Sequence, residues 1–127
     1  GRGTAHCASV GKGLLAHAPA DVLERYLSRP LRAVTRKTIT DRDEFLDHLK
    51  GVRAQGYATT IEESLVGIYG LAAPIRDRRN EVVAAVCIAG RNGSLLKRRS
   101  DVIEAANAIG RDISANAFPA RSLLPLS

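Results

Sequence analysis

The residues best suited to chemistry are His6 and Cys7, which are neighbours near the start of the sequence. An imidazole can activate a thiol as a nucleophile, but adjacent residues usually point apart, and a working Cys–His pair must meet in space. Together with His17 the two could bind a metal, yet no set of four ligands with the usual zinc spacings is present. We therefore predict no catalytic residue and no metal site, and we expect His48 at the surface or at the boundary of the core.

Two further motifs fall short of catalytic or phosphate-binding signatures. Glu62 and Glu63 could act as acid and base only beside a second perturbed group, and a solvated turn is the simpler expectation. The run from Gly11 to Gly13 is too short for a phosphate-binding loop, because it lacks the upstream glycine and a serine or threonine after Lys12. No cofactor is predicted. An enzyme is a weaker hypothesis than the two non-enzymatic functions considered below.

Length and composition describe one ordinary domain. The chain has 127 residues, of which 45% are hydrophobic and 25% charged, and no apolar run approaches the roughly eighteen residues that a membrane helix needs. Only Cys7 and Cys87 are present; a bridge between them stays open, but few cysteines without a leader favour a reduced, cytoplasmic setting. The net charge of +6 permits nucleic-acid binding, but the scarcity of aromatic residues favours solvated turns and loops for the basic residues. These are Arg76, Arg78, Arg79, Arg91, Lys97, Arg98 and Arg99.

Helical periodicity and end signals predict helices over 9–18, 21–27, 40–56 and 101–116. Thr40, three residues before Asp43, is expected to cap the third helix, Gly56 to end it, and Ser100 to cap the last. The apolar stripes of the two longest helices are Phe45, Leu46, Leu49 and Val52 in one, and Val102, Ala106, Ile109 and Ile113 in the other. Strands are predicted over 57–61, 68–75 and 81–89, giving an α+β fold with a mostly antiparallel sheet.

Alternation along these strands predicts two unlike faces. One face carries small residues, namely Ala58, Thr60, Gly70, Ala72, Ala85, Cys87 and Ala89. The other carries Tyr57, Ile61, Tyr69, Leu71, Ile75, Val82, Val86 and Ile88, and is expected to pack against the long helices. Over the small face, either a helix lies unusually close or a concave site receives a small molecule. In the second case, the helix start at Ser9, Val10 and Gly11 could hold a carboxylate.

A chain of motifs resembles the effector-binding domain of IclR-type transcriptional regulators. The family's His-Ala-Ser/Thr-Ala-x-Gly-Lys-Ala-Leu-Leu-Ala stretch matches residues 6–16, and its Thr-x-Thr-Asp matches 38–41. Its Ile/Val-Arg-x-Gln/Glu-Gly-Tyr-Ala matches 52–58, and its Glu-Glu, Gly-Val and Ile-Ala-Ala-Pro-Val-x-Asp motifs resemble 62–63, 67–68 and 71–77. The order and the gaps agree from about residue 3 to residue 117.

The resemblance implies a GAF-like or profilin-like antiparallel sheet with helices packed on it, which binds a small organic acid. It also implies a homodimer or homotetramer that reaches DNA only through a winged helix-turn-helix domain missing from this chain, with no membrane partner. We expect the sensor domain over 1–118, without its first strands, and a flexible tail over 119–127. The other hypothesis from a different class is a dimerisation module without a small ligand.

The family's pocket lies over the small face, and this sequence departs from its pattern there. Thr60 replaces an acid found in many relatives, Gly70 replaces a cysteine found in some, and Cys87-Ile88-Ala89-Gly90 replaces Ser-x-Ser-Gly. These changes imply a more apolar pocket than the glyoxylate type, suited to a larger or aromatic acid. The expected site comprises Ser9, Val10, Gly11, Thr60, Gly70, Cys87 and Ala89.

Overall fold

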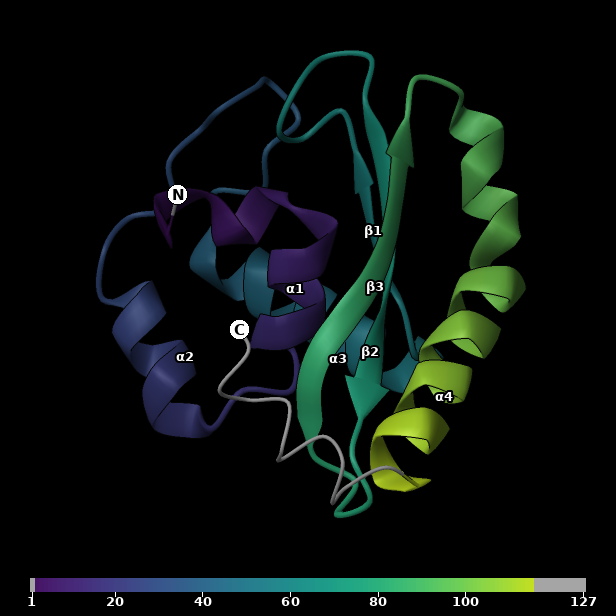
Figure 1. The fold of residues 1–127 in the computed structure, drawn as a ribbon. Helices are drawn as coiled ribbons and strands as arrows, with labels where there is room; N and C mark the ends of the chain where they lie inside the picture. The colour runs from purple at the N-terminus through teal and green to yellow at the C-terminus, as the bar shows by residue number, and fades with distance from the viewer. Residues whose placement is uncertain (1, 116–127) are drawn as a thin grey trace.

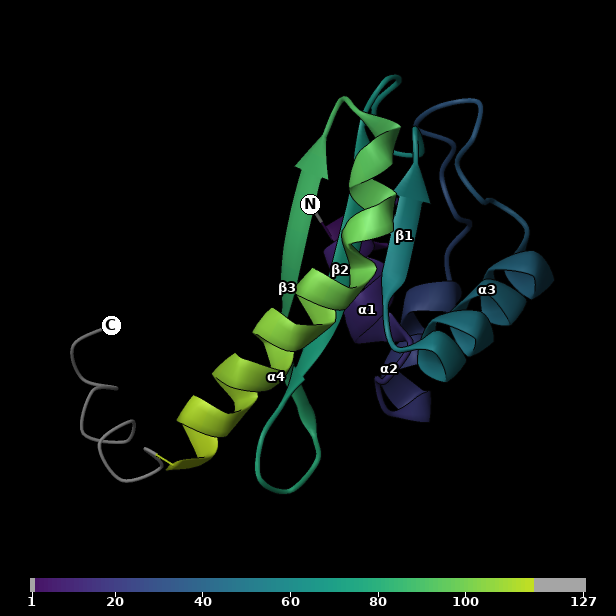
Figure 2. The same ribbon diagram turned by 90° about the vertical axis from the view of Figure 1, so that its right-hand side faces the viewer.

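The computed structural model describes residues 2–115, and it has helices on both faces of one small sheet. In chain order, the elements are η1 (Arg2–Cys7), α1 (Ser9–Leu15), α2 (Ala20–Leu27), α3 (Arg42–Gln55), β1 (Ala58–Ile61), β2 (Tyr69–Arg76), β3 (Val82–Gly90), η2 (Gly93–Arg98) and α4 (Arg99–Ala115). Figure 2 shows α4 in front of the sheet and α1 behind it. Within 2–115, no helix is both long and apolar enough to cross a membrane.

The sheet confirms the predicted division into two faces. Its order is β1-β2-β3, both pairs are antiparallel, and each strand lies within about a residue of its predicted bounds. Directly paired residues share a face, and two rows of small-face partners cross the sheet: Ala58–Ala72–Cys87 and Thr60–Gly70–Ala89. Alternation in the sequence therefore assigns these side chains to their faces. Val82 is an exception, because the register shifts between Ile75 and Arg76, so that Val82 pairs with Arg76 on the small-face side of β2 and its predicted place on the bulky face is wrong.

Separate hydrophobic clusters form on the two sides of the sheet. On the bulky face, Leu71, Ala73 and Ile75 pack against Val102 and Ala106 of α4, as expected. The other long helix, α3, does not lie on that face, and this part of the prediction is wrong. Its stripe packs with α1 and α2 on the opposite side, in a cluster of Leu15, Ala16, Leu27, Leu31, Phe45, Leu49, Val52 and Ala58.

Several helix ends differ from their predicted positions. The N-cap of α3 is Asp41, not Thr40, because the Asp41 carboxylate accepts the Glu44 N–H at 2.9 Å; Gly56 ends the helix with φ 87°, as predicted. Ser100 lies inside α4 rather than at its cap, since η2 leads directly into α4. Lys97 and Arg98 therefore lie on η2 rather than in a loop.

The α1 helix ends at Leu15, earlier than predicted, and the stripe of α4 is buried only in part. Val102 and Ala106 are buried, but Ile109 and Ile113 are 39% and 37% exposed. The buried face of α4 continues from Ala106 to Gly110, where an added Cβ would lie 2.7 Å from the Arg76 carbonyl oxygen, and Ile109 therefore lies beside this face rather than on it. The predicted ends at 116 and 118, and the predicted tail over 119–127, lie outside the described residues.

Candidate functional site

The start of α1 rests directly on the small face, at Gly70. A Cβ atom added to Gly70 would lie 2.5 Å from Thr60 Oγ1 and 3.0 Å from Ser9 Oγ. Ser9 and Thr60 are both buried, at 8% and 5% exposure. The structure thus brings these three predicted site residues together. At Gly70 the helix lies unusually close to the small residues, which is one of the two arrangements that the sequence allowed; the other was a concave site for a small molecule.

The part of the small face on β3 is uncovered. Cys87 and Ala89 are exposed, and Val83 on the same face is 51% exposed. The α1 helix and β3 lie side by side (Figure 1), so the exposed stretch begins beside the helix that covers Gly70. Val10 and Gly11 are half-buried on the first turn of α1. Of the seven predicted residues, Ser9, Thr60 and Gly70 therefore form a buried group where α1 meets the sheet, Cys87 and Ala89 are exposed on β3, and Val10 and Gly11 lie between these two extremes of burial.

A buried ion pair, absent from the sequence-based predictions, joins α1 to the end of β1. Lys12 is completely buried, and its Nζ lies 2.6 Å from Glu63 Oε1 and donates to Thr59 O at 2.9 Å. Burial lowers the pKa of Lys12, and the hydrogen bond and charge of Glu63 oppose that effect. The expectation of a solvated turn is wrong for Glu63, which is 7% exposed. The one signal for this pair in the sequence was a lysine between two glycines in a helix expected to pack on the sheet, because a buried lysine needs a charged partner.

His6 and Cys7 are buried and hydrogen-bonded within the fold. The His6 ring bonds Tyr26 Oη through Nδ1 and Arg32 O through Nε2, both at 2.8 Å. The Cys7 thiol donates to Thr4 O at 3.2 Å, and burial raises the pKa of this thiol, which disfavours the thiolate. Both cysteines are free. In the described part of the chain, no three His, Cys, Asp or Glu residues are grouped to hold a metal ion.

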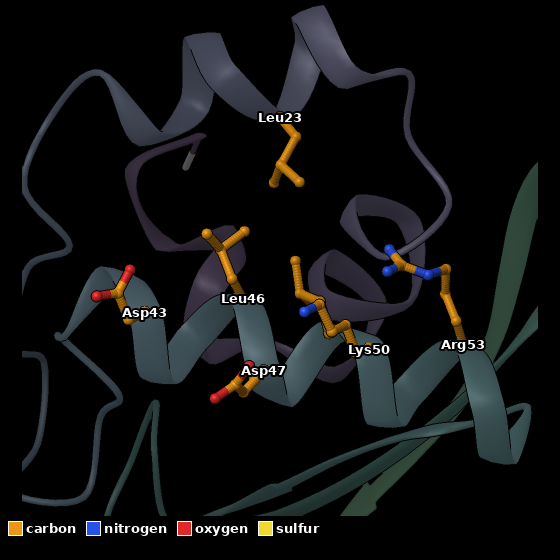
Figure 3. A pocket seen from close by; sticks show the side chains of 7 residues that line it. Leu23, Asp43, Leu46, Asp47, Lys50 and Arg53 are labelled. Carbon is orange, nitrogen blue, oxygen red and sulfur yellow. The ribbon is translucent and has the colours of Figure 1, made fainter.

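A cavity of about 300 Å³ lies between α2 and α3, where the sequence predicted no site. Leu23 of α2 and Leu46 of α3 point toward one another across it (Figure 3). The remaining lining residues all belong to α3: Asp43, Asp47, Leu49, Lys50 and Arg53. Charges of both signs therefore surround a leucine-lined space.

The other two histidines should make the domain less stable in mild acid. Burial, followed by the charges of Arg76 and Arg53, lowers the pKa of His17; burial, followed by the charge of Lys12, lowers the pKa of His48, which lies at the core boundary as expected. The unfolded chain therefore binds protons first as the pH falls. The free energy of unfolding should decrease as the pH falls through 6.5, the ordinary value, and level off below the folded pKa values.

The double variant His17→Gln/His48→Gln should lose most of this pH dependence in urea titrations between about pH 7 and pH 5. The Lys37 ammonium lowers the pKa of Glu62 from 4.5. This carboxyl therefore titrates below the pH range of the experiment and does not contribute to the pH dependence assigned to the histidines. An unchanged pH dependence in the double variant would show that neither histidine is responsible.

Comparisons with known proteins identify the domain. The family model for the bacterial transcriptional regulator IclR C-terminal domain matches residues 1–115. The glycerol operon regulatory protein of Streptomyces coelicolor is 38% identical in an alignment of 120 positions, which covers 89% of this chain and 47% of that protein. The chain thus spans about half the length of this curated relative.

Solved structures agree with the sequence comparisons. The Thermotoga maritima IclR structure matches with a TM-score of 0.75 and 30% identity, covering 86% of this chain and 47% of that one. The inducer-binding domain of PobR from Acinetobacter, a double mutant in complex with 3-hydroxybenzoic acid, matches with a TM-score of 0.75 and 26% identity, covering 84% and 65%. This chain therefore belongs to the IclR family of bacterial transcriptional regulators and corresponds to their C-terminal domain.

Proposed function

We propose that this domain is the sensor of a DNA-binding transcriptional regulator, that it binds a small organic acid, and that binding modulates transcription. The complex of the PobR inducer-binding domain with 3-hydroxybenzoic acid supports this proposal, because the two domains share a fold. A winged helix-turn-helix domain elsewhere in the regulator would bind DNA. The regulator would act in the cytoplasm as a homodimer or homotetramer.

The uneven cover of the small face is the observation that carries the proposed site. Thr60 and Gly70 are buried under α1, whereas Cys87 and Ala89 on the same face are exposed. An acid lying over β3 would have α1 as a side wall, the Ser9 hydroxyl and the Cys87 thiol as polar contacts, and small side chains beneath it. The first turn of α1, at Val10 and Gly11, would complete that wall.

The residue types at the proposed site favour an aromatic acid over a small polar one. Thr60 and Gly70 are covered by α1, so the surface left for an acid is the small side chains of β3, where Ala89 replaces a serine of the family pattern. Most of the binding free energy would therefore come from apolar contact. The acid could change DNA affinity only by its difference in affinity for two arrangements of the regulator. We therefore expect hydroxybenzoates to bind and glyoxylate to bind poorly.

The variant Cys87→Phe should abolish binding, because its ring would occupy the space over β3. In thermal-shift measurements with 3-hydroxybenzoate and 4-hydroxybenzoate, the unmodified domain should gain about 2–3 kcal/mol of stability at roughly 100 times the Kd. Cys87→Phe should gain none, while its own unfolding midpoint without acid stays near that of the parent.

Val83→Phe provides a matched control, since it places the same ring on the same strand and face, at a position that is 51% exposed and outside the proposed site. It should keep the response to hydroxybenzoates. An equal response in the parent and in Cys87→Phe would refute the site, and the absence of any response to the acids in the parent would refute the proposed ligand class.

The close seating of α1 at Gly70 favours a second candidate, a dimerisation module without a small ligand. In that case the small residues serve only to let the helix approach the sheet. The same acid screen separates the two functions when it is combined with light scattering. A dimer that forms without any acid response would support the module.

A further inference from the structure

The Lys12–Glu63 pair fixes α1 to one end of the sheet through several bonds. Besides contacting Glu63 Oε1, Lys12 Nζ donates to Thr59 O. The other carboxylate oxygen, Glu63 Oε2, accepts the Ile61 N–H at 3.1 Å. One buried ammonium and one buried carboxylate thus bond to the main chain on both sides of Thr60, the β1 residue that meets α1 at Gly70.

The pair sits one helical turn from the proposed effector site. Ser9 precedes Lys12 by three residues, so both lie on the face of α1 that points toward the sheet. Ser9 and Thr60 approach each other beside Gly70. The Lys12 bonds therefore join α1 to β1 on the same face of the helix, one turn after Ser9.

The same pair also leads to an exposed turn. The carbonyl of Glu63 accepts the Thr38 hydroxyl at 2.6 Å, and Glu62 accepts the Gly67 N–H at 2.9 Å and pairs with Lys37. These bonds hold the turn after β1, whose tip exposes Leu65 and Val66 at 59% and 72%.

We propose that Lys12 is a positioning residue for the effector site, which holds α1 against the sheet through Glu63. This inference rests on the proposed function, because it concerns the wall of the same site. Lys12 does not contact the effector, since it is fully buried beneath the helix. Loss of either partner leaves the other charge buried without compensation, so α1 separates locally from the sheet and the wall of the site is lost.

Labelling of the two cysteines tests this without any effector. Cys7 is completely buried just before α1, and Cys87 is exposed on β3, so a thiol reagent followed by mass spectrometry reports on both at once. In Lys12→Met and in Glu63→Gln, Cys7 should be labelled about tenfold faster than in the parent, as expected for local opening, with Cys87 unchanged. In the double variant the increase should be far below the product of the two, because the residues act as a unit.

Two controls separate positioning from general destabilisation. Val102→Ala removes packing on the opposite side of the sheet, and should lower global stability without selective labelling of Cys7. Lys50→Met removes an exposed lysine of α3 and should change nothing. Equal acceleration in Val102→Ala, or protection of Cys7 in Lys12→Met, would overturn the inference.

A second experiment measures the affinity of the parent and of the variants for 3-hydroxybenzoate. Glu63→Gln should stay folded and bind it about tenfold more weakly than the parent, because only a fraction of molecules hold α1 in place. Unchanged affinity, together with accelerated labelling of Cys7, would overturn the role in effector binding. If the parent does not bind the acid, the proposed ligand class fails, while the labelling result still decides whether Lys12 positions α1.

Discussion

Replacing Gly11 with alanine should destabilise the domain by about 2–3 kcal/mol, whereas the same change at Gly13 should stabilise it by about 0.5–1 kcal/mol. Both glycines lie in α1, where alanine is the better helix former. At Gly11, however, a Cβ would lie 2.2 Å from the carbonyl oxygen of Ala5 and 2.7 Å from its carbonyl carbon. These are main-chain atoms of η1, which cannot rotate away.

Gly13 is the matched control, because an added Cβ there meets nothing within 4 Å. Urea unfolding followed by circular dichroism would give both free energies, and Gly51→Ala, in α3 and equally unobstructed, should behave like Gly13→Ala. If Gly11→Ala proved as stable as Gly13→Ala, the close contact between η1 and α1 would be wrong. The structure also gives this glycine–lysine–glycine run a role other than phosphate binding. Gly11 lets the main chain of η1 pack against α1, and Lys12 pairs with Glu63.

Signals that are local in the sequence predicted the sheet well. Alternating residues assigned Thr60, Gly70 and Cys87 to one face because the strand period of two is independent of what covers the sheet. Helix starts were less secure. Thr40 and Asp41 are both good caps, and only the main-chain conformation decides which side chain reaches the free N–H groups. The residues after β3 contain no signal that η2 continues directly into α4, so Ser100 was wrongly predicted as the cap of the last helix.

The candidate site was predictable as a set of residues but not as a shape. Strand parity cannot say how far α1 extends across the small face, and so it cannot separate buried Thr60 from exposed Cys87. The Lys12–Glu63 pair joins residues far apart in the chain, and a single sequence contains no signal for which acid a buried lysine will meet. The cavity between α2 and α3 likewise depends on the packing of two separate helices.

The second large effect is expected at Phe45, where truncation to alanine should cost about 3–5 kcal/mol. Phe45 is completely buried in the cluster that joins α1, α2 and α3, and its ring lies edge-on to that of His6 at 6.3 Å. Removing the ring leaves a cavity on the side of the sheet that carries α1. Since a domain of this size is stable by only about 5–15 kcal/mol, the loss is a large part of the total.

Leu46→Ala is the natural control, because Leu46 is the next residue of the same helix and is only half-buried beside the α2–α3 cavity. Its cost should be nearer 1 kcal/mol, since about half of the removed surface already faces water or the cavity. Urea titrations of both variants give the comparison directly. Equal losses would mean that the cluster around Phe45 is no better packed than the cavity wall. A loss confined to Phe45→Ala, accompanied by faster labelling of Cys7, would show that this cluster, together with the Lys12–Glu63 pair, is what keeps α1 on the sheet.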